Sequence, residues 1–272
     1  MEKKKRKWIR FYVFLAFAII VLIVAFLGKY LAPYDPLETD YASILSAPSA
    51  KHWCGTDNVG RDVLSRILCG ASTSFSLTFL MIGIVAVIGT CIGVVSGYFG
   101  GFLDTCIMRC TDVLLAFPST VFAIAVVGMM GPGILNTVIA LGFVWWTKYA
   151  RLTRGLASSI RTKDYITEAR FGGCGTVNIL FRYVLPNILP QVVIMATVDI
   201  GGMMLSLAGL SFLGLASQPP TPEWGYMLYE GKSYLQTAPW IMLFAGLAIF
   251  ITVIVFNLLG DSLRDILDPK ER

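Results

Sequence analysis

Residues Ile67 to Leu103 read ILCGASTSFSLTFLMIGIVAVIGTCIGVVSGYFGGFL, a run of 37 residues without a charged side chain. A helix needs about 20 apolar residues to cross the hydrocarbon core of a bilayer, so this run is long enough for a complete span. Val113 to Thr147, with 35 uncharged residues, and Ser233 to Gly260, with 28, have the same property. The sequence therefore predicts an all-α, polytopic membrane protein.

The composition of the whole chain supports this prediction. Of the 272 residues, 56% are apolar and 14% are charged, whereas soluble domains carry roughly 45–50% apolar and about 25% charged residues. An ordinary soluble enzyme is therefore excluded. The net charge of +5 does not indicate nucleic-acid binding, because 13 of the 22 Lys and Arg residues lie in two segments that flank apolar runs.

Six spans are expected where apolar runs are separated by charges and by Gly/Pro turns. They lie at 9–28, 73–97, 112–130, 134–147, 188–210 and 239–259. With the N-terminus in the cytoplasm, the inside segments carry 17 Lys and Arg residues and the outside segments carry 5. This bias predicts that both termini are cytoplasmic. The first run follows basic residues and lacks a small-residue cleavage site, so it is expected to remain as an anchor helix.

Catalytic and metal-binding constellations are absent from the sequence. The six cysteines form no CxxC pair and lie mostly in or beside apolar spans, so they are expected to be packing residues. His52 is the only histidine, which excludes a His-rich metal site, and no GxxxxGK[ST] loop is present to cradle a phosphate. The chain is therefore not expected to be an enzyme or to bind a cofactor itself.

A long outside loop, 29–71, ends in a segment with helical periodicity. From Gly60 to Leu68 the apolar residues, beginning with Val63 and Leu64, fall on one side of a helix and the charged residues fall elsewhere, which predicts an interfacial helix. Arg61 and Asp62 are expected either to pair within this helix or to contact a partner.

The largest cytoplasmic segment, 148–187, is far longer than a turn between two spans requires. Asp164 to Gly175 reads DYITEARFGGCG, a short helix ended by glycines that can adopt positive φ. A second short helix is expected from Thr176 to Val184, stopping at Leu185-Pro186-Asn187. Two such helices beneath the membrane would form a docking surface.

This segment resembles the EAA loop of permease subunits in binding-protein-dependent ABC importers. Alignment on Gly173 and on Leu185-Pro186-Asn187 places Thr167, Glu168 and Ala169 under E-A-A, with Arg170 next to them. The sequence departs from the pattern at Thr167, where glutamate is usual, and at Tyr183, where a histidine often stands.

Three other segments resemble the peptide and nickel subfamily of these permeases, in the expected order. They are Ala208 to Gly214, Pro219 to Gly225 and Asn257 to Pro269. A fourth, in the outside loop, is similar to the motif GTDxxGRDxxSR. Its matching residues are Gly55, Thr56, Asp57, Gly60, Arg61, Asp62, Ser65 and Arg66.

The resemblance implies one importer transmembrane domain over residues 1–272. An anchor helix and outside loop would occupy 1–71, five core spans with the coupling loop 148–187 would occupy 72–260, and 261–272 would form a cytoplasmic tail. The implied partners are a second permease subunit in a heterodimer, two ATPase subunits that bind ATP and magnesium, an extracytoplasmic solute-binding protein and membrane lipid, with no nucleic acid. The implied location is the cytoplasmic membrane of a bacterium or archaeon, as a multi-pass protein.

Asp199 is the one acidic residue well inside an apolar span. It lies 12 residues beyond Asn187, about 18 Å along a helix and thus near mid-bilayer. An ionised Asp there costs roughly 2.5–3.5 kcal/mol, so it is expected to face a translocation path or a hydrogen-bonding partner. Met203 and Met204 follow it, and this stretch resembles nickel-type members.

Three interpretations of the transported solute and its energy source follow. The leading one is an importer of nickel or a metal chelate, because thioethers are soft ligands, although Met in an apolar helix is more often a core residue. The alternative is a di- or oligopeptide importer. A remote alternative, an ion-coupled secondary transporter, would be expected to carry matched repeats and more intramembrane acids.

Overall fold

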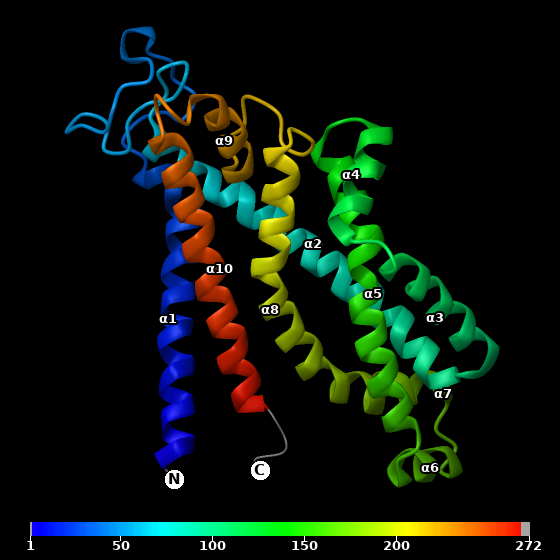
Figure 1. Ribbon diagram of the computed structural model, residues 1–272. Coiled ribbons are helices and arrows are strands. Elements are labelled where there is room, and N and C mark those ends of the chain that lie inside the picture. Colours follow the sequence, from blue (N-terminus) through cyan, green and yellow to red (C-terminus); the bar gives the residue numbers. More distant parts are fainter. Residues whose placement is uncertain (1, 268–272) are drawn as a thin grey trace. The chain divides into compact units, whose positions relative to one another are not determined.

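The protein is described by a computed structural model for residues 2–267 (Figure 1). The helices, in chain order, are α1 Glu2–Leu31, η1 Tyr41–Ser43, α2 Val63–Phe99, α3 Gly101–Leu115, α4 Ser119–Met130, α5 Ile134–Arg161, α6 Asp164–Phe171, α7 Thr176–Ile179, η2 Leu180–Val184, α8 Leu185–Phe212, α9 Trp224–Gly231, η3 Lys232–Tyr234 and α10 Trp240–Leu267. The all-α prediction is confirmed for the described residues. The predicted tail begins inside α10, and residues 268–272 lie outside the described part.

The chain forms two compact units, and each is built from several chain segments. The first contains residues 2–80, 126–138 and 197–267, and the second contains residues 81–125 and 139–196. Four helices, α2, α4, α5 and α8, continue from one unit into the other.

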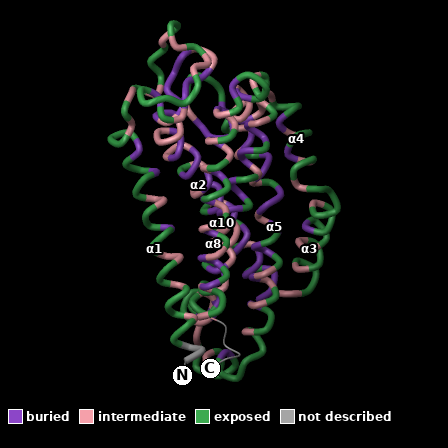
Figure 2. The backbone as a smooth tube through the Cα atoms, turned by 60° about the vertical axis from the view of Figure 1, so that its left-hand side comes forward, coloured by how far each residue is buried: buried purple, intermediate pink, exposed green. Residues whose placement is uncertain are grey.

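In the first unit, α1 packs along α10, and α10 packs against α9. A Cβ at Gly28 would lie 2.0 Å from the carbonyl oxygen of Leu68, so glycine is what allows α1 to approach α2 this closely. Phe75, Trp224 and Phe256 form an aromatic cluster with ring centroids 5.8 Å apart around Phe75, which is fully buried. Much of α1 remains exposed along its length (Figure 2), as expected of a helix with an apolar face toward lipid.

In the second unit, α2 and α5 are in backbone contact through three glycines spaced four residues apart. A Cβ at Gly89, Gly93 or Gly97 would lie 2.4, 2.3 or 2.2 Å from a carbonyl oxygen of α5. Small residues at this spacing let membrane helices pack closely, where dispersion contacts and not water exclusion stabilise the pair.

Four described helices are long and apolar enough to cross a membrane, or five if the bent pair α3 and α4 counts as one span. The predicted span 112–130 is wrong as a continuous helix, because α3 and α4 meet at an angle of 86°. Pro118 lies at the break. It lacks a backbone N–H and disfavours helical geometry in Phe117, so the helix ends before it.

Two further boundaries differ from the prediction. The span expected at 134–147 belongs to a 28-residue helix, α5, which continues to Arg161 through the first part of the predicted cytoplasmic segment. The helix expected to stop at Leu185 instead runs on, because the π-helical turn Leu180–Val184 joins α7 to α8 without a break.

The segment predicted as an interfacial helix is not a separate helix. Val63 to Leu68 form the first turns of α2, which continues to Phe99. The polar side of this segment does not face water, because Arg61, Asp62 and Arg66 are all buried. Their charges are compensated by other charged side chains, as described below.

Candidate functional site

The predicted coupling segment centres on α6, whose end is fixed by glycine. The amide N–H of Cys174 donates to Ala169 O at 2.9 Å and that of Gly173 donates to Arg170 O at 3.0 Å. These are the two bonds of a Schellman motif, which requires a left-handed residue after the helix. Gly173 supplies it with φ of +80°, so the predicted glycine stop is confirmed.

One face of α6 is anchored and the other is open. Ile166 is fully buried, whereas Thr167 and Glu168 are exposed and Ala169 is half-buried. Phe171 is 89% exposed at the C-terminal end. Aromatic side chains are enriched at protein-binding surfaces, so the exposed ring of Phe171 is compatible with a docking role for this end of α6.

The side chain of Arg170 contacts the C-terminal end of α2. Its Nη2 donates to the hydroxyl of Tyr98 at 2.9 Å, and its guanidinium lies 5.2 Å from the centre of the same ring. Nearby, Arg161 Nη1 donates to Phe99 O at 3.2 Å. Arg170 therefore positions α6 within the second unit, and its partner Tyr98 is a residue that the sequence analysis did not identify.

The triplet Leu185-Pro186-Asn187 begins α8. Pro186 and Asn187 are exposed, and Asn187 Nδ2 donates to Tyr183 O at 2.6 Å across the π-helical turn. The ring of Tyr183 lies 6.4 Å from that of Tyr165 on α6. The two predicted parts of the coupling segment are thus brought together by a tyrosine pair.

The three predicted path residues occupy different environments on α8. Asp199 is half-buried, whereas Met203 and Met204 are 0% and 2% exposed and belong to the core of the first unit. On a helix, Gly202, Met203 and Ser206 share a face with Asp199, and of these Gly202 is exposed, Ser206 is half-buried and Met203 is buried. Asp199 is therefore more accessible than either methionine, although Met203 lies on the same face of α8.

Asp57, Arg61 and Arg66 of the outside-loop motif are buried and form a cluster of four charges with the half-buried Glu230 of α9. Arg61 Nε lies 2.6 Å from Asp57 Oδ2 and its Nη2 lies 2.8 Å from Glu230 Oε1. Arg66 Nη1 lies 3.3 Å from Asp57 Oδ2 and its Nη2 lies 2.5 Å from Glu230 Oε2. The cluster is electrically neutral. Burial lowers the pKa of Arg61, but the charges and hydrogen bonds of Asp57 and Glu230 together outweigh it and hold that pKa above its usual value.

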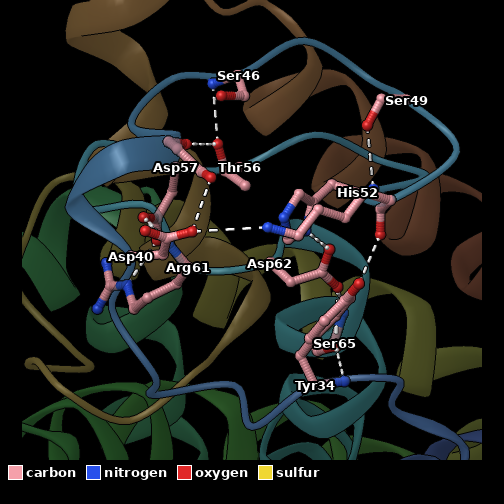
Figure 3. Close-up of polar contacts among 12 residues, drawn as sticks. Tyr34, Asp40, Ser46, Ser49, His52, Thr56, Asp57, Arg61, Asp62 and Ser65 are labelled. Atoms are coloured by element: carbon pink, nitrogen blue, oxygen red, sulfur yellow. Dashed lines mark hydrogen bonds and ion pairs between the residues drawn. The ribbon is translucent and has the colours of Figure 1, made fainter.

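Asp62 does not pair with Arg61, in contrast to one of the two expectations. Its Oδ1 lies 2.9 Å from His52 Nδ1, and its Oδ2 accepts bonds from Ser65 N and Oγ, each at 2.8 Å (Figure 3). Thr56 O accepts a bond from Trp240 Nε1 at 3.1 Å. Gly60 of the motif allows the backbone to approach Asp40 closely, because a Cβ at Gly60 would lie 1.9 Å from Asp40 O.

The proline-rich segment before α9 is anchored by an acid. Glu223 is buried, and its carboxylate accepts bonds from Gly225 N at 2.8 Å and Tyr226 N at 2.9 Å, which caps the first turn of α9. Ser74 Oγ lies 3.3 Å from the same carboxylate and accepts a bond from Trp224 N. In the part of the chain that the structure describes, no group of three or more His, Cys, Asp or Glu residues could hold a metal ion.

Comparison with known proteins places these features in one family. Residues 89–272 match the family model described as binding-protein-dependent transport system inner membrane component. The chain is 43% identical over 269 residues to the glutathione transport system permease protein GsiD of Pectobacterium atrosepticum, which covers 97% of this chain and 89% of that protein. It is 45% identical over 255 residues to GsiD of Escherichia coli, covering 93% and 84%.

A solved structure of the MetNI methionine ABC transporter, in an inward-facing conformation, has a similar fold. The TM-score is 0.59 and the identity is 18%, with 74% of this chain and 96% of that chain covered. The chain is thus a multi-pass membrane protein that is not itself an enzyme, and ATP hydrolysis falls to partner subunits. It belongs to the binding-protein-dependent transport system inner membrane components, as a permease subunit of an ABC importer.

Proposed function

We propose that this chain is one of two permease subunits in an importer of glutathione or of short peptides of similar size. The observation that carries the proposal is the identity of 43–45% to glutathione permeases over nearly the whole chain. The nickel interpretation has less support. Met203 and Met204, which favoured it, are buried in the core of the first unit, and the relatives named above are glutathione permeases.

In the proposed complex, α6 docks on a cytoplasmic ATPase subunit. The exposed Glu168 and Phe171 provide a polar and an apolar contact, and the glycine-terminated end fixes the direction in which the chain leaves the helix. The Leu185-Pro186-Asn187 triplet, linked to α6 through Tyr183 and Tyr165, passes the movement of the ATPase to α8.

The proposed path runs along the side of α8 that carries Asp199. A carboxylate in an apolar span is unfavourable against lipid, so this side is expected to face the solute or the second permease subunit. An ionised Asp199 would suit the amino group of a peptide. We place the subunit in the cytoplasmic membrane of a bacterium, with six spans when the bent pair α3 and α4 and the more polar α5 each count as one, and with both termini inside.

Uptake by a deletion strain tests the proposed cargo. Cells that lack this chain are complemented with the wild-type gene and supplied with radiolabelled glutathione, a dipeptide or nickel. Complementation is expected to restore glutathione or dipeptide uptake and to leave nickel uptake unchanged. Restored nickel uptake alone would reject the proposal. Uptake that persists without the partner ATPase but stops with an uncoupler would indicate a secondary transporter.

A further inference from the structure

An apolar cleft lies between the outer parts of α8 and α10, beside α9 (Figure 1). Its volume is about 500 Å³, and all of its lining residues belong to the first unit. They include Leu205 and Phe212 of α8, Leu228 of α9, and Met242 and Phe250 of α10. Leu205 and Phe250 are each 60% exposed. A cleft lined only by apolar residues within two membrane helices suits hydrocarbon and not water.

Glycines show where the two helices touch and where they separate. Toward the inner end of α10, a Cβ at Gly260 would lie 2.6 Å from Val198 Cγ2 and 3.0 Å from Val198 N, so α8 and α10 are in close contact there. Toward the outer end, a Cβ at Gly209 would meet no described atom within 4 Å, and one at Gly246 would meet only Leu228 Cδ2, at 3.8 Å. The cleft therefore opens toward the outside and closes toward the inside.

The cleft is about as long as one leaflet of a bilayer is thick. Its lining on α10 runs from Met242 to Val253, which is about 16 Å at 1.5 Å per residue. Half of the hydrocarbon core of a bilayer is about 15 Å thick. A helix of a second subunit that packed here along its whole span would need a groove of about twice this length. The length therefore favours an acyl chain of one leaflet over a transmembrane helix as the occupant.

A positive charge lies at the outer end of the cleft. Lys232 Nζ is 5.9 Å from the ring centre of Phe212, which lines the cleft, and 4.3 Å from that of Tyr229. Lys232 is exposed, and the acid nearest to it in sequence, Glu230, is paired with two arginines. Within the described part of the chain, Lys232 contacts these two rings and forms no ion pair with a carboxylate. Its charge is therefore available to an anion at the membrane surface.

The cleft is separate from the proposed path. Ala208, in the α8 wall of the cleft, lies nine residues beyond Asp199, which is about two and a half helical turns. The two residues are therefore on opposite sides of α8. Glutathione and short peptides are polar, so an apolar cleft on this side of the helix is not explained by the transported solute.

We propose that the cleft holds an anionic phospholipid of the outer leaflet. One acyl chain lies between α8 and α10, along Leu205, Gly209 and Phe250, and the headgroup phosphate accepts a charge-assisted hydrogen bond from Lys232. The apolar cleft supplies affinity for any phospholipid, and the lysine supplies the preference for a negative headgroup. Filling the cleft and removing the charge therefore have different expected effects.

The test measures the affinity of the tightest lipid site on the complete importer in detergent, by native mass spectrometry with added phosphatidylglycerol or phosphatidylcholine. The wild type is expected to prefer phosphatidylglycerol about fivefold, and Lys232→Gln to reduce this preference to less than about twofold. Lys29→Gln, at an exposed lysine in the last turn of α1, is the charge control and should keep the preference.

A second pair of variants tests the cleft itself. Gly209→Leu places a side chain in the open space between the helices and is expected to weaken binding of both lipids about tenfold or more. Gly83→Leu is the matched control, because Gly83 is equally open and does not line the cleft. Lipid binding by Gly83→Leu should equal that of the wild type.

Three outcomes would overturn the proposal. An unchanged preference in Lys232→Gln would separate the headgroup from this lysine. An equal loss of preference in Lys29→Gln would show general attraction of anionic lipid and not a site. Unchanged lipid binding by Gly209→Leu, with reduced recovery of the second permease subunit, would assign the cleft to a helix of that subunit. None of these results depends on the cargo, so each would leave the proposed function intact.

Discussion

Glu230 Oε2 lies 2.5 Å from Arg66 Nη2, although the two residues are 164 positions apart in the sequence. The side chain of Arg66 is 1% exposed, and Asp57 and Arg61 complete a neutral group of four charges. The group joins the outside loop, the first turn of α2 and α9. Because the charges are buried, removing one of them leaves the opposite charge uncompensated.

Glu230→Gln is therefore expected to destabilise the protein by about 3 kcal/mol or more, since two buried guanidinium groups lose their shared partner. The measurement is the midpoint of thermal unfolding of the purified protein in detergent. A matched control is Asp112→Asn, which removes an acid from a half-exposed pair with Arg151 and is expected to cost less than about 1 kcal/mol. Equal midpoints for both variants would contradict the cluster's structural role.

Gly93→Ala is expected to prevent close packing of α2 on α5. The added methyl would lie 2.1 Å from Thr153 Oγ1 and 2.3 Å from Ala150 O, and a backbone cannot move away without separating the helices. Overpacking of this kind costs about 1–3 kcal/mol. Gly83→Ala, on the same helix, is the control, because its methyl would meet no described atom within 4 Å. Folded yield after membrane extraction should fall for Gly93→Ala only.

The sequence predicted well those features that depend on local composition. Long apolar runs predicted the positions of α1, α2 and α10, because a backbone in lipid must satisfy its own hydrogen bonds as a helix. Hydropathy carries no information on the direction of a helix axis, so the 86° bend between α3 and α4 was not predicted, although Pro118 lies at the break. The hydropathy pattern also placed the end of the fourth helix too early, since α5 continues as a helix through the charged residues up to Arg161.

The candidate site was predicted less completely, for a physical reason. Arg61 and Asp62 are predicted from the sequence to pair with each other or to contact a partner, whereas the burial of Arg61 and Arg66 depends on Glu230, which is remote in the chain. Tyr98, the partner of Arg170, is 72 residues away from it. The glycine stop of α6 was predicted because a Schellman motif is local.

Both termini are expected to be cytoplasmic, from the asymmetry of Lys and Arg. Lys5→Cys and Asp265→Cys, each in a cysteine-free background, should be protected from a membrane-impermeant thiol reagent in intact cells and should react in inside-out vesicles. Trp53→Cys, in the exposed part of the outside loop, should react in intact cells. Labelling of Asp265→Cys from outside would rule out this topology.

Asp199→Asn is expected to reduce uptake by about tenfold or more while the complex still assembles, because an intramembrane carboxylate is generally functional. Met204→Leu replaces a buried side chain by one of similar volume and should change uptake by less than about twofold. Uptake is compared at equal amounts of assembled complex. Normal transport by Asp199→Asn would remove this residue from the path, and a strong loss in Met204→Leu would restore the methionine interpretation.

Gly173→Val is expected to uncouple the importer. Gly173 has φ of +80°, which costs an L-residue roughly 1–2 kcal/mol and a β-branched one more, so the end of α6 should be displaced. A Cβ there meets no described atom within 4 Å, so the effect would arise from the backbone and not from a clash. Gly175→Val is the matched control, because Gly175 is equally open and has an extended backbone with φ of −65°. Co-purification of the ATPase and uptake should fall together in Gly173→Val and persist in Gly175→Val. Wild-type behaviour of Gly173→Val in both assays would show that α6 is not the coupling element.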